Sequence, residues 1–449
     1  MHSPKICYRH KMRPPVQKLK RAAGVVALVG LVALMPAAKS SSDAIGQVTQ
    51  YPLNGTTNAG IADLLTTLDG QVWFAQFYAN QINRISKTGQ ISSATPNLPP
   101  NAGPRGLAVG ADLNVWFTEV TTGAIGRISS RGEVTSFTNG IMAGAQPQFI
   151  TAGPDGNLWF TESGVNQIGR ITPAGEIKEF PISNSAEFIT DGPDGNLWFT
   201  EPGANQIGRI TPAGKVTEFS AGITSGGYPW DITAGSDGNL WFTELKGNRI
   251  GRITPQGKVT EFSKGSPAGA QPLGIAPGAD GNVWFTQPGT ALANQIGRIT
   301  PVGTITQFST GISPAAGVHG IAPGPSGDMW FGELAGNRIG RIATGAPPLP
   351  NRARIITAST AKSVINVSVR VPGAGIVSVL GESAPASSTP LCWNAQTATK
   401  AATYRIKCSL LTTSSPTNKE ALSVRLKVLF TPTGGTPSAT ARTVKIKKN

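Results

Sequence analysis

The sequence predicts an all-β protein: a seven-bladed β-propeller closed by its N-terminal strand, followed by a small β-sandwich. The first observation is a repeat with one tryptophan per unit, at spacings of 43, 43, 39, 43, 43 and 46 residues: Trp73, Trp116, Trp159, Trp198, Trp241, Trp284 and Trp330. A period in the low forties is typical of four-stranded propeller blades. The second observation is the composition, because 55 Gly, 35 Pro and only 14% charged residues suit a chain rich in tight turns.

One unit, residues 147–180, predicts the strands of a blade. We expect an inner strand at 147–152, a second at 158–162, a third at 167–172 and an outer strand at 176–180. Seven units contain the first three strands, but only six continue into the fourth. Residues 46–51 resemble the missing strand, so we expect them to complete the seventh blade and the propeller to span 43–344.

The repeated side chains are expected to form the scaffold. The Trp and Phe of each second strand should pack between neighbouring blades. An arginine recurs on every third strand and invites a ligand-binding interpretation, but pairing between blades is the simpler account: Arg84, Arg127, Arg170, Arg209, Arg252, Arg298 and Arg341.

Residues 1–38 have the features of a secretory signal peptide. Seven Lys and Arg without an acid precede an apolar run at 22–34, and small residues follow at 36–38. The run has 13 residues, fewer than the roughly 20 that span a bilayer, although an uncleaved anchor is the alternative. We expect a secreted, periplasmic or cell-envelope protein. Cys392 and Cys408 would then form a disulfide in an oxidising compartment.

The tail has a different composition from the propeller. Residues 345–351 form a proline-rich linker, and residues 352–449 predict a β-sandwich with alternating apolar and polar positions at 364–371, 375–380, 421–430 and 441–446. From residue 345 onward, 14 Lys and Arg stand against two Glu, a formal charge of +12. We expect this part to bind an anionic cell-envelope polymer, or else to present a merely solvated basic surface. Export and the scarcity of aromatic residues argue against nucleic acid. The sandwich resembles, weakly, the small immunoglobulin-like domains of exported bacterial proteins. We expect a monomer.

Positions at which the repeats differ are candidates for function. Eleven residues before each Trp, on the inner strand, the copies have Ala62, Arg105, Gln148, Glu187, Trp230, Leu273 and His319. Three residues after each Trp stand Gln76, Glu119, Glu162, Glu201, Glu244, Gln287 and Glu333. Because the two strands are antiparallel, each pair should face each other and the fourteen side chains should ring one mouth of the channel. We expect this acidic mouth to bind a small molecule, a peptide or a glycan.

Four of these pairs carry specific expectations. Arg105 should form an ion pair with Glu119, and Glu187 should face Glu201, so that like charges raise one pKa or recruit a cation. Trp230, with Tyr228 nearby, should provide an aromatic wall. His319 and Glu333 could form a general base oriented by a carboxylate, or half of a metal site. A polar pair without catalytic function is the alternative.

The phrases at 153–162 and 205–214 closely resemble the virginiamycin B lyase, or streptogramin lyase, family. The resemblance covers residues 46–344 and implies a seven-bladed propeller that uses Mg²⁺ to linearise type B streptogramins by elimination. It implies that His319 is the catalytic histidine and that Glu333 is a metal ligand. Two further polar positions of the family fall on Leu273 and Gly317, whose side chains cannot bind a metal. Whether the chain is an enzyme is therefore open.

Two functions follow from these observations. The first is a ligand-binding propeller, and the second is an Mg²⁺-dependent carbon–oxygen lyase acting on streptogramin-like cyclic depsipeptides. A structural role in spacing partners is the third.

Overall fold

The computed structural model describes residues 43–53, 60–95, 98–289, 294–361, 364–383, 391–410 and 422–446. The expected signal peptide lies outside these residues. In the described part of the chain, no helix is both long and apolar enough to cross a membrane. Nearly all regular structure is β, as the repeat predicts, and the one helix described is the short η1 (Pro202–Ala204).

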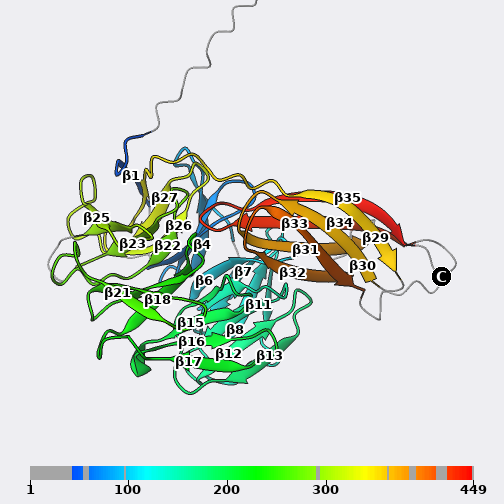
Figure 1. The fold of residues 1–449 in the computed structure, drawn as a ribbon, viewed down its shortest axis with the longest axis horizontal. Coiled ribbons are helices and arrows are strands. Elements are labelled where there is room, and N and C mark those ends of the chain that lie inside the picture. Colours follow the sequence, from blue (N-terminus) through cyan, green and yellow to red (C-terminus); the bar gives the residue numbers. More distant parts are fainter. Residues whose placement is uncertain are drawn as a thin grey trace, which may run out of the picture. The chain divides into compact units, whose positions relative to one another are not determined.

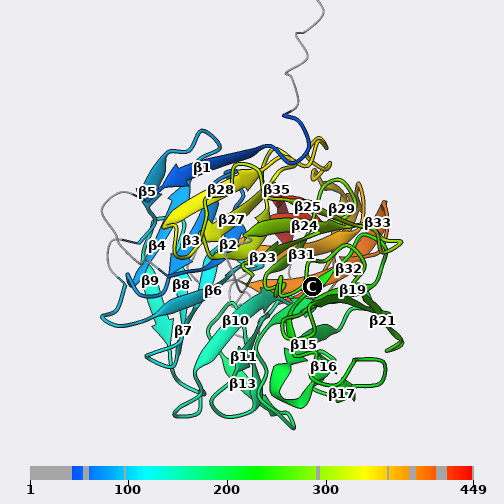
Figure 2. The same cartoon turned by 90° about the vertical axis from the view of Figure 1, so that its left-hand side faces the viewer.

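Seven four-stranded antiparallel sheets correspond to the seven repeats (Figures 1 and 2). Blades 1 to 3 contain β2 (Ile61–Thr66), β3 (Val72–Gln76), β4 (Gln81–Ile85) and β5 (Ile91–Ser93); β6 (Pro104–Val109), β7 (Val115–Glu119), β8 (Ala124–Ile128) and β9 (Val134–Phe137); and β10 (Pro147–Ala152), β11 (Leu158–Glu162), β12 (Gln167–Ile171) and β13 (Ile177–Pro181). Blades 4 to 6 contain β14 (Ile189–Asp191), β15 (Leu197–Glu201), β16 (Gln206–Ile210) and β17 (Val216–Phe219); β18 (Pro229–Ala234), β19 (Leu240–Glu244), β20 (Arg249–Ile253) and β21 (Val259–Phe262); and β22 (Ile275–Pro277), β23 (Val283–Gln287), β24 (Gln295–Ile299) and β25 (Ile305–Phe308). The strands of the type unit lie within one residue of their predicted bounds.

The N-terminal strand closes the ring, as predicted. Blade 7 contains β26 (Val318–Pro323), β27 (Met329–Glu333) and β28 (Arg338–Ile342), and β1 (Val48–Pro52) is its outer strand. Figure 2 shows β1 lying along β28, with Thr49 paired with Arg341. The inner strand β26 also packs beside β2, so the last blade adjoins the first. The ring therefore depends on residues nearly 300 positions apart in the sequence.

The scaffold side chains pack between blades, also as predicted. Trp116 of blade 2 lies in one buried cluster with Leu158 and Phe160 of blade 3. Four of the recurrent arginines join neighbouring blades by donating to the carbonyls of Pro173, Pro212, Pro255 and Pro301: Arg127, Arg170, Arg209 and Arg252. These arginines belong to the scaffold rather than to a ligand site.

The tail contains two sheets that share one apolar core. The first has β29 (Arg354–Ala361), β30 (Val364–Val371) and β33 (Ala402–Ser409), and the second has β32 (Cys392–Ala398), β31 (Gly375–Ser383), β34 (Leu422–Pro432) and β35 (Ser438–Ile446). Sequence alternation had indicated β30, β31, β34 and β35 but not the other three strands. The likeness to immunoglobulin domains stays a prediction, as do the domain boundaries.

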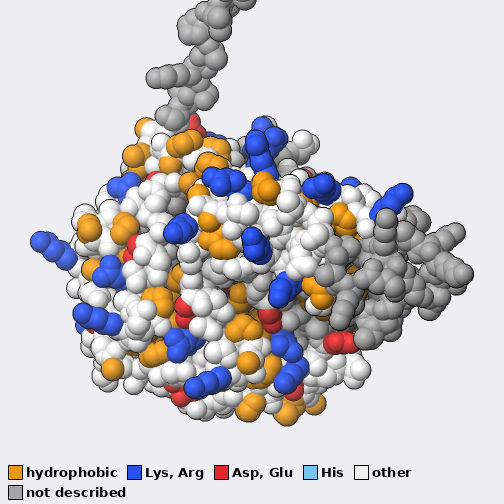
Figure 3. All heavy atoms as spheres, turned by 45° about the vertical axis from the view of Figure 1, so that its right-hand side comes forward, with side chains coloured by type: hydrophobic (Ala, Val, Ile, Leu, Met, Phe, Trp, Pro, Cys, Tyr) orange, Lys and Arg blue, Asp and Glu red, His pale blue; other side chains and the backbone are white. Residues whose placement is uncertain are grey.

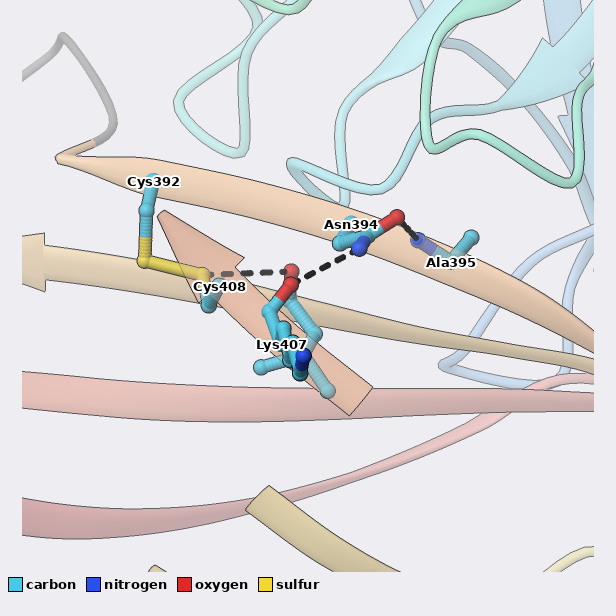
Figure 4. The surroundings of a disulfide bond; sticks show 6 residues. Cys392, Asn394, Ala395, Lys407 and Cys408 are labelled. Atoms are coloured by element: carbon cyan, nitrogen blue, oxygen red, sulfur yellow. Dashed lines mark hydrogen bonds between the residues drawn. A yellow bond between two sulfur atoms is a disulfide. The ribbon is translucent and has the colours of Figure 1, made fainter. Parts of the chain in front are cut away.

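The predicted disulfide is present and joins the two sheets. Cys392 on β32 and Cys408 on β33 are bonded, with their Cα atoms 5.5 Å apart (Figure 4). Both cysteines are fully buried in the shared core. Beside them, the side-chain amide of Asn394 donates to the carbonyl of Lys407 at 2.7 Å, a second link between the same strands. The disulfide thus holds the sheets together where only 15 residues separate the cysteines.

Candidate functional site

The inner strands bring together part of the predicted mouth. Arg105 Nη2 lies 2.7 Å from Glu187 Oε1, and Arg105 also donates to the side-chain oxygen of Gln148. Gln148 is held in turn by Ser163 Oγ at 2.8 Å. Three blades therefore contribute to one polar network, which we call the mouth cluster together with Trp230 and His319.

A ring of threonines positions the mouth cluster. Each threonine lies on the second strand of one blade. Its hydroxyl donates to a backbone carbonyl of the next blade, at the variable position eleven residues before the Trp of that next blade. Thr118, Thr161, Thr200 and Thr286 hold in this way the carbonyls of Gln148, Glu187, Trp230 and His319. The same contact is made by Thr243 to the carbonyl of Leu273, so a neighbouring blade holds the backbone at five of the seven variable positions.

Aromatic rings continue the cluster on one side, as predicted for Trp230. The rings of Tyr228 and Trp230 stack with centroids 6.0 Å apart. Phe188 meets Trp230 edge-on and stacks on Phe149 at 3.6 Å. The Arg105 guanidinium lies 4.9 Å from the Phe149 ring centroid. An apolar wall therefore borders the arginine, which suits a ligand with both apolar and polar groups.

Beside Arg105 and His319 lies a cavity of about 310 Å³, lined by Gly60, Ile61, Ala62, Phe77, Tyr78, Arg105, His319 and Leu334. The Nδ1 atom of His319 is buried and has no hydrogen-bond partner among the described residues. Burial, followed by the nearby Arg105 charge, lowers the pKa of His319 to about 4. The imidazole is therefore neutral near pH 7, and its free nitrogen can accept a proton or a hydrogen bond.

The predicted acidic mouth is wrong. For four of the five second-strand glutamates, the residue on the facing strand stands twelve, not eleven, positions before the Trp: Pro104 faces Glu119, Pro147 faces Glu162, Pro229 faces Glu244 and Val318 faces Glu333. A register shift follows in each of these inner strands, so simple counting failed there by one residue. A shift of one residue turns a side chain to the other face of a sheet.

The second-strand acids and amides instead point away from the mouth cluster and are buried. Glu119, Glu162, Glu201, Glu244, Gln287 and Glu333 are at most 1% exposed. Most meet residues of the outer strands: Glu119 accepts from Ser136, and Glu333 accepts from Gln50. Gln287 donates to Ser266. These side chains belong to the blade interior.

Three expected pairs are corrected accordingly. Arg105 pairs with Glu187 rather than Glu119. Glu201 accepts from Gln206, while Glu187 lies with Arg105. Burial mainly, with Glu218 rather than Glu187 nearby, raises the pKa of Glu201 to about 7. His319 does not face Glu333, because Val318 does.

Two half-buried aspartates on the inner strands were missed. Asp63 Oδ1 accepts from its neighbour's amide and Oδ2 from Leu107 N of the next blade, and Asp231 bonds Ile275 N in the same way. Burial raises the pKa of Asp63 to about 7 and that of Asp231 well above its ordinary value. Both stand ten residues before a Trp, as do Phe149 and Phe188. Counting to that position as well would have found all four.

The fold and the site define a β-propeller with a mixed polar and aromatic cluster on its inner strands. The sequence model of the Virginiamycin B lyase family matches residues 39–188 and 184–347, and the chain belongs to this family. No curated protein matches the chain.

Solved structures of the family agree. A streptogramin B lyase is 36% identical, covers 66% of this chain and 96% of its own, and superposes with a TM-score of 0.61. A selenomethionine-substituted virginiamycin B lyase from Staphylococcus aureus is 38% identical over 66% of this chain and 99% of its own, with a TM-score of 0.61. A catalytically inactive histidine-to-alanine variant of that enzyme with quinupristin is also 38% identical, with the same coverage and a TM-score of 0.60.

The residues present do not fit the Mg²⁺ ion that family membership suggests. Among the described residues, no group of three or more His, Cys, Asp and Glu could hold a metal. Glu333 accepts from Gln50 with one oxygen, and its other oxygen lies 4.0 Å from Arg338 Nη1. Leu273 and Gly317 offer no ligand atoms from their side chains. Mg²⁺ demands oxygen ligands in near-octahedral geometry, which this set does not provide.

Proposed function

We propose that this propeller binds a small organic molecule, a peptide or a glycan at the mouth cluster. The observation that carries the proposal is the cavity of about 310 Å³ beside Arg105 and His319, into which converge one guanidinium, one neutral imidazole and two aromatic side chains. Its volume lies at the lower end of the range typical of ligand sites. Arg105 is already paired with Glu187, so the site suits a neutral or zwitterionic ligand better than a simple anion.

Ligand-observed NMR with a set of aromatic and polar fragments tests this proposal on the full chain. We expect some fragments to bind the original chain and to show a weaker saturation-transfer signal with the Arg105→Ala variant and with the His319→Ala variant. Gln167→Ala is the control: Gln167 is half-buried on β12, the third strand of blade 3, and its substitution should leave the signal unchanged. If no fragment depends on Arg105 or His319, the proposal fails.

A second candidate is a lyase acting on streptogramin-like cyclic depsipeptides. His319, kept at the position that the resemblance assigns to the catalytic base, favours it, because its Nδ1 is free and neutral near pH 7. The proton that His319 would take is the one whose removal starts elimination of the ester. The loss of ligand atoms at Leu273 and Gly317 argues against Mg²⁺-dependent turnover.

Quinupristin separates the two candidates. Purified protein is incubated with quinupristin, with and without Mg²⁺, and linear product is sought by mass spectrometry. Product that disappears in His319→Ala establishes the lyase. Saturable binding of quinupristin without linear product supports a binding propeller whose ligand resembles a streptogramin.

We further propose that the chain is exported and that its tail binds an anionic envelope polymer. Support comes from one face of the sheet β29–β30–β33, where Arg354 pairs with Arg370 across the strands and Arg405 and Lys407 follow on β33. All four side chains are exposed. Like charges directly opposed destabilise a sheet unless a partner offsets them. On the face drawn in Figure 3, Lys and Arg side chains are distributed over the surface with few Asp and Glu between them.

Cell fractionation and a salt series test this second proposal. We expect the protein in the envelope or medium, and its affinity for isolated envelope to fall as salt rises. The double variant Arg370→Gln/Arg405→Gln should weaken this binding, whereas Lys258→Gln on the propeller should not. Retention in the cytoplasm, or no envelope binding at low salt, contradicts the proposal.

A further inference from the structure

Six of the seven blades bury their tryptophan in the same way. An aromatic residue of the outer strand stacks on it, with centroids 5.3–5.5 Å apart: Phe137, Phe180, Phe219, Phe262, Phe308 and Tyr51. The indole N–H donates to an aspartate of the preceding turn: Asp112, Asp155, Asp194, Asp237, Asp280 and Asp328. A turn glycine of the next blade then covers the aromatic ring, as Gly175 covers Phe137.

Blade 1 lacks each of these three contacts. Ala94 stands where the other blades have an aromatic residue. Asp69 stands at the turn position but binds the Thr67 hydroxyl and the amide of Gln71 instead of the indole. Trp73 is only 9% exposed, and its buried Nε1 atom has no hydrogen-bond partner among the described residues. Gly132 stands at the position of the covering glycine, but no atom lies within 4 Å of the place where a Cβ atom on it would lie.

A cavity of about 500 Å³ occupies the resulting space between blades 1 and 2. Its apolar wall includes Trp73, Ala94, Leu113, Val115 and Ile128, and its polar wall includes Arg84, Arg131, Asp69, Ser129 and Ser130. It shares no lining residue with the cavity beside His319. A volume of this size is ordinary for a small-molecule site.

The arginine of blade 1 is also unlike its counterparts. Arg170 and Arg209 each lie near the turn aspartate and over two aromatic rings. Arg84, in contrast, has a hydrogen bond to Ser92 Oγ at 3.2 Å and, within the described residues, neither an ion pair nor a ring contact. Together with Arg131 it gives the cavity two guanidinium groups. Asp69 is the one carboxylate among the lining residues, and it already accepts hydrogen bonds from Thr67 and Gln71, so the two guanidinium groups leave the lining with a positive charge that favours an anionic group.

We propose that this blade 1 cavity binds an aromatic carboxylate, whose ring takes the place of the missing aromatic side chain on Trp73 and whose carboxylate pairs with Arg84 and Arg131. The ring recovers the stacking that the other six blades obtain internally. A carboxylate suits a guanidinium, because its two oxygens accept two parallel N–H hydrogen bonds from the planar guanidinium group. A polar atom of the ligand can also accept from Trp73 Nε1, which otherwise stays buried and unpaired.

Isothermal titration of the full chain with 3-phenylpropanoate tests the proposal, with the neutral 3-phenylpropan-1-ol and with acetate as comparison probes. We expect 3-phenylpropanoate to bind at least tenfold more tightly than either. Ala94→Phe restores the missing ring, and it should abolish binding while raising the melting temperature. Arg84→Gln should weaken binding about tenfold, whereas Arg170→Gln, the equivalent change in blade 3, should not.

Two results overturn the proposal. The first is equal binding of 3-phenylpropanoate to the original chain, Ala94→Phe and Arg84→Gln. The second is no binding to the original chain, which would make the cavity a packing defect only. Should Ala94→Phe fail to fold, the comparison of Arg84→Gln with Arg170→Gln decides. His319→Ala should leave this binding unchanged, so the result is independent of the site at the mouth cluster.

Discussion

Replacing Glu162 by glutamine should stabilise the propeller at neutral pH. The Glu162 side chain is fully buried, and neither carboxylate oxygen receives a hydrogen bond from a donor among the described residues. Burial first, and the nearby carboxylate of Glu179 second, raise the pKa of Glu162 to about 8. Near pH 7 the folded protein therefore holds a proton there that the unfolded chain has released.

The magnitude follows from proton linkage. A folded pKa above the unfolded value of 4.5 means that the wild-type chain loses stability as pH rises from 4.5 towards 8. Each pH unit in this window changes the free energy of unfolding by about 1.4 kcal/mol, so the loss at pH 7 has an upper limit of roughly 3 kcal/mol. A glutamine does not ionise, and Glu162→Gln removes this loss while keeping the shape of the side chain.

Urea unfolding at pH 4.5, 6, 7 and 8 measures the effect. Glu162→Gln should match the wild type at pH 4.5 and exceed it increasingly at higher pH. The control is Glu119→Gln at the same repeat position, where the hydroxyls of Ser136 and Thr122 donate to the carboxylate. The control should lose about 1 kcal/mol, since an amide offers one acceptor oxygen fewer. The reasoning would be refuted if the free energy of unfolding of Glu162→Gln changed with pH in parallel with that of the wild type, or if it were lower than that of the wild type at pH 8.

Three further predictions concern stability. Deleting residues 43–53 removes β1 and the stacking of Tyr51 on Trp330, so thermal melting followed by circular dichroism should occur several degrees lower and with less cooperativity; an unchanged melt would mean that closure contributes little. Phe137→Ala should lower the free energy of unfolding by about 2–3 kcal/mol in urea, because Trp116 loses its stacked ring while Phe137 itself is only half-buried; a loss below 1 kcal/mol would contradict the packing described. Replacing both Cys392 and Cys408 by serine should cost about 3 kcal/mol, as expected for a closed loop of this length; equal stability with and without reductant would argue against the bond.

The repeat allowed most of the propeller to be predicted. One Trp per unit located the second strand of every blade, and the missing seventh outer strand located β1. The tail was harder, because β29, β32 and β33 carry no repeat and their alternation is weak. The cysteine pair was nevertheless correct, since only two cysteines remain after residue 38.

The candidate site was predicted only in part. Arg105, Gln148, Trp230 and His319 lie on inner strands, where counting from the Trp placed them, and Glu187 lies two residues before β14. The partners assigned to Arg105 and His319 were wrong, because a register shift in the inner strand cannot be seen in a residue count. The blade 1 cavity was not predicted, although Ala94 in place of an aromatic residue was visible in the sequence.

The sequence by itself determined the number of blades, their strand order and the N-terminal closure, because these depend on periodicity and on which strand is missing. Only the tertiary structure decided which side chains meet. In the folded protein Glu333 is buried in the interior of its blade, and Arg105 of blade 2 forms an ion pair with Glu187 of blade 4. The physical reason is that strand periodicity fixes the face of a side chain only while the register is unbroken. One shifted residue reverses that face, and a contact between blades such as that of Arg105 with Glu187 joins residues 82 positions apart.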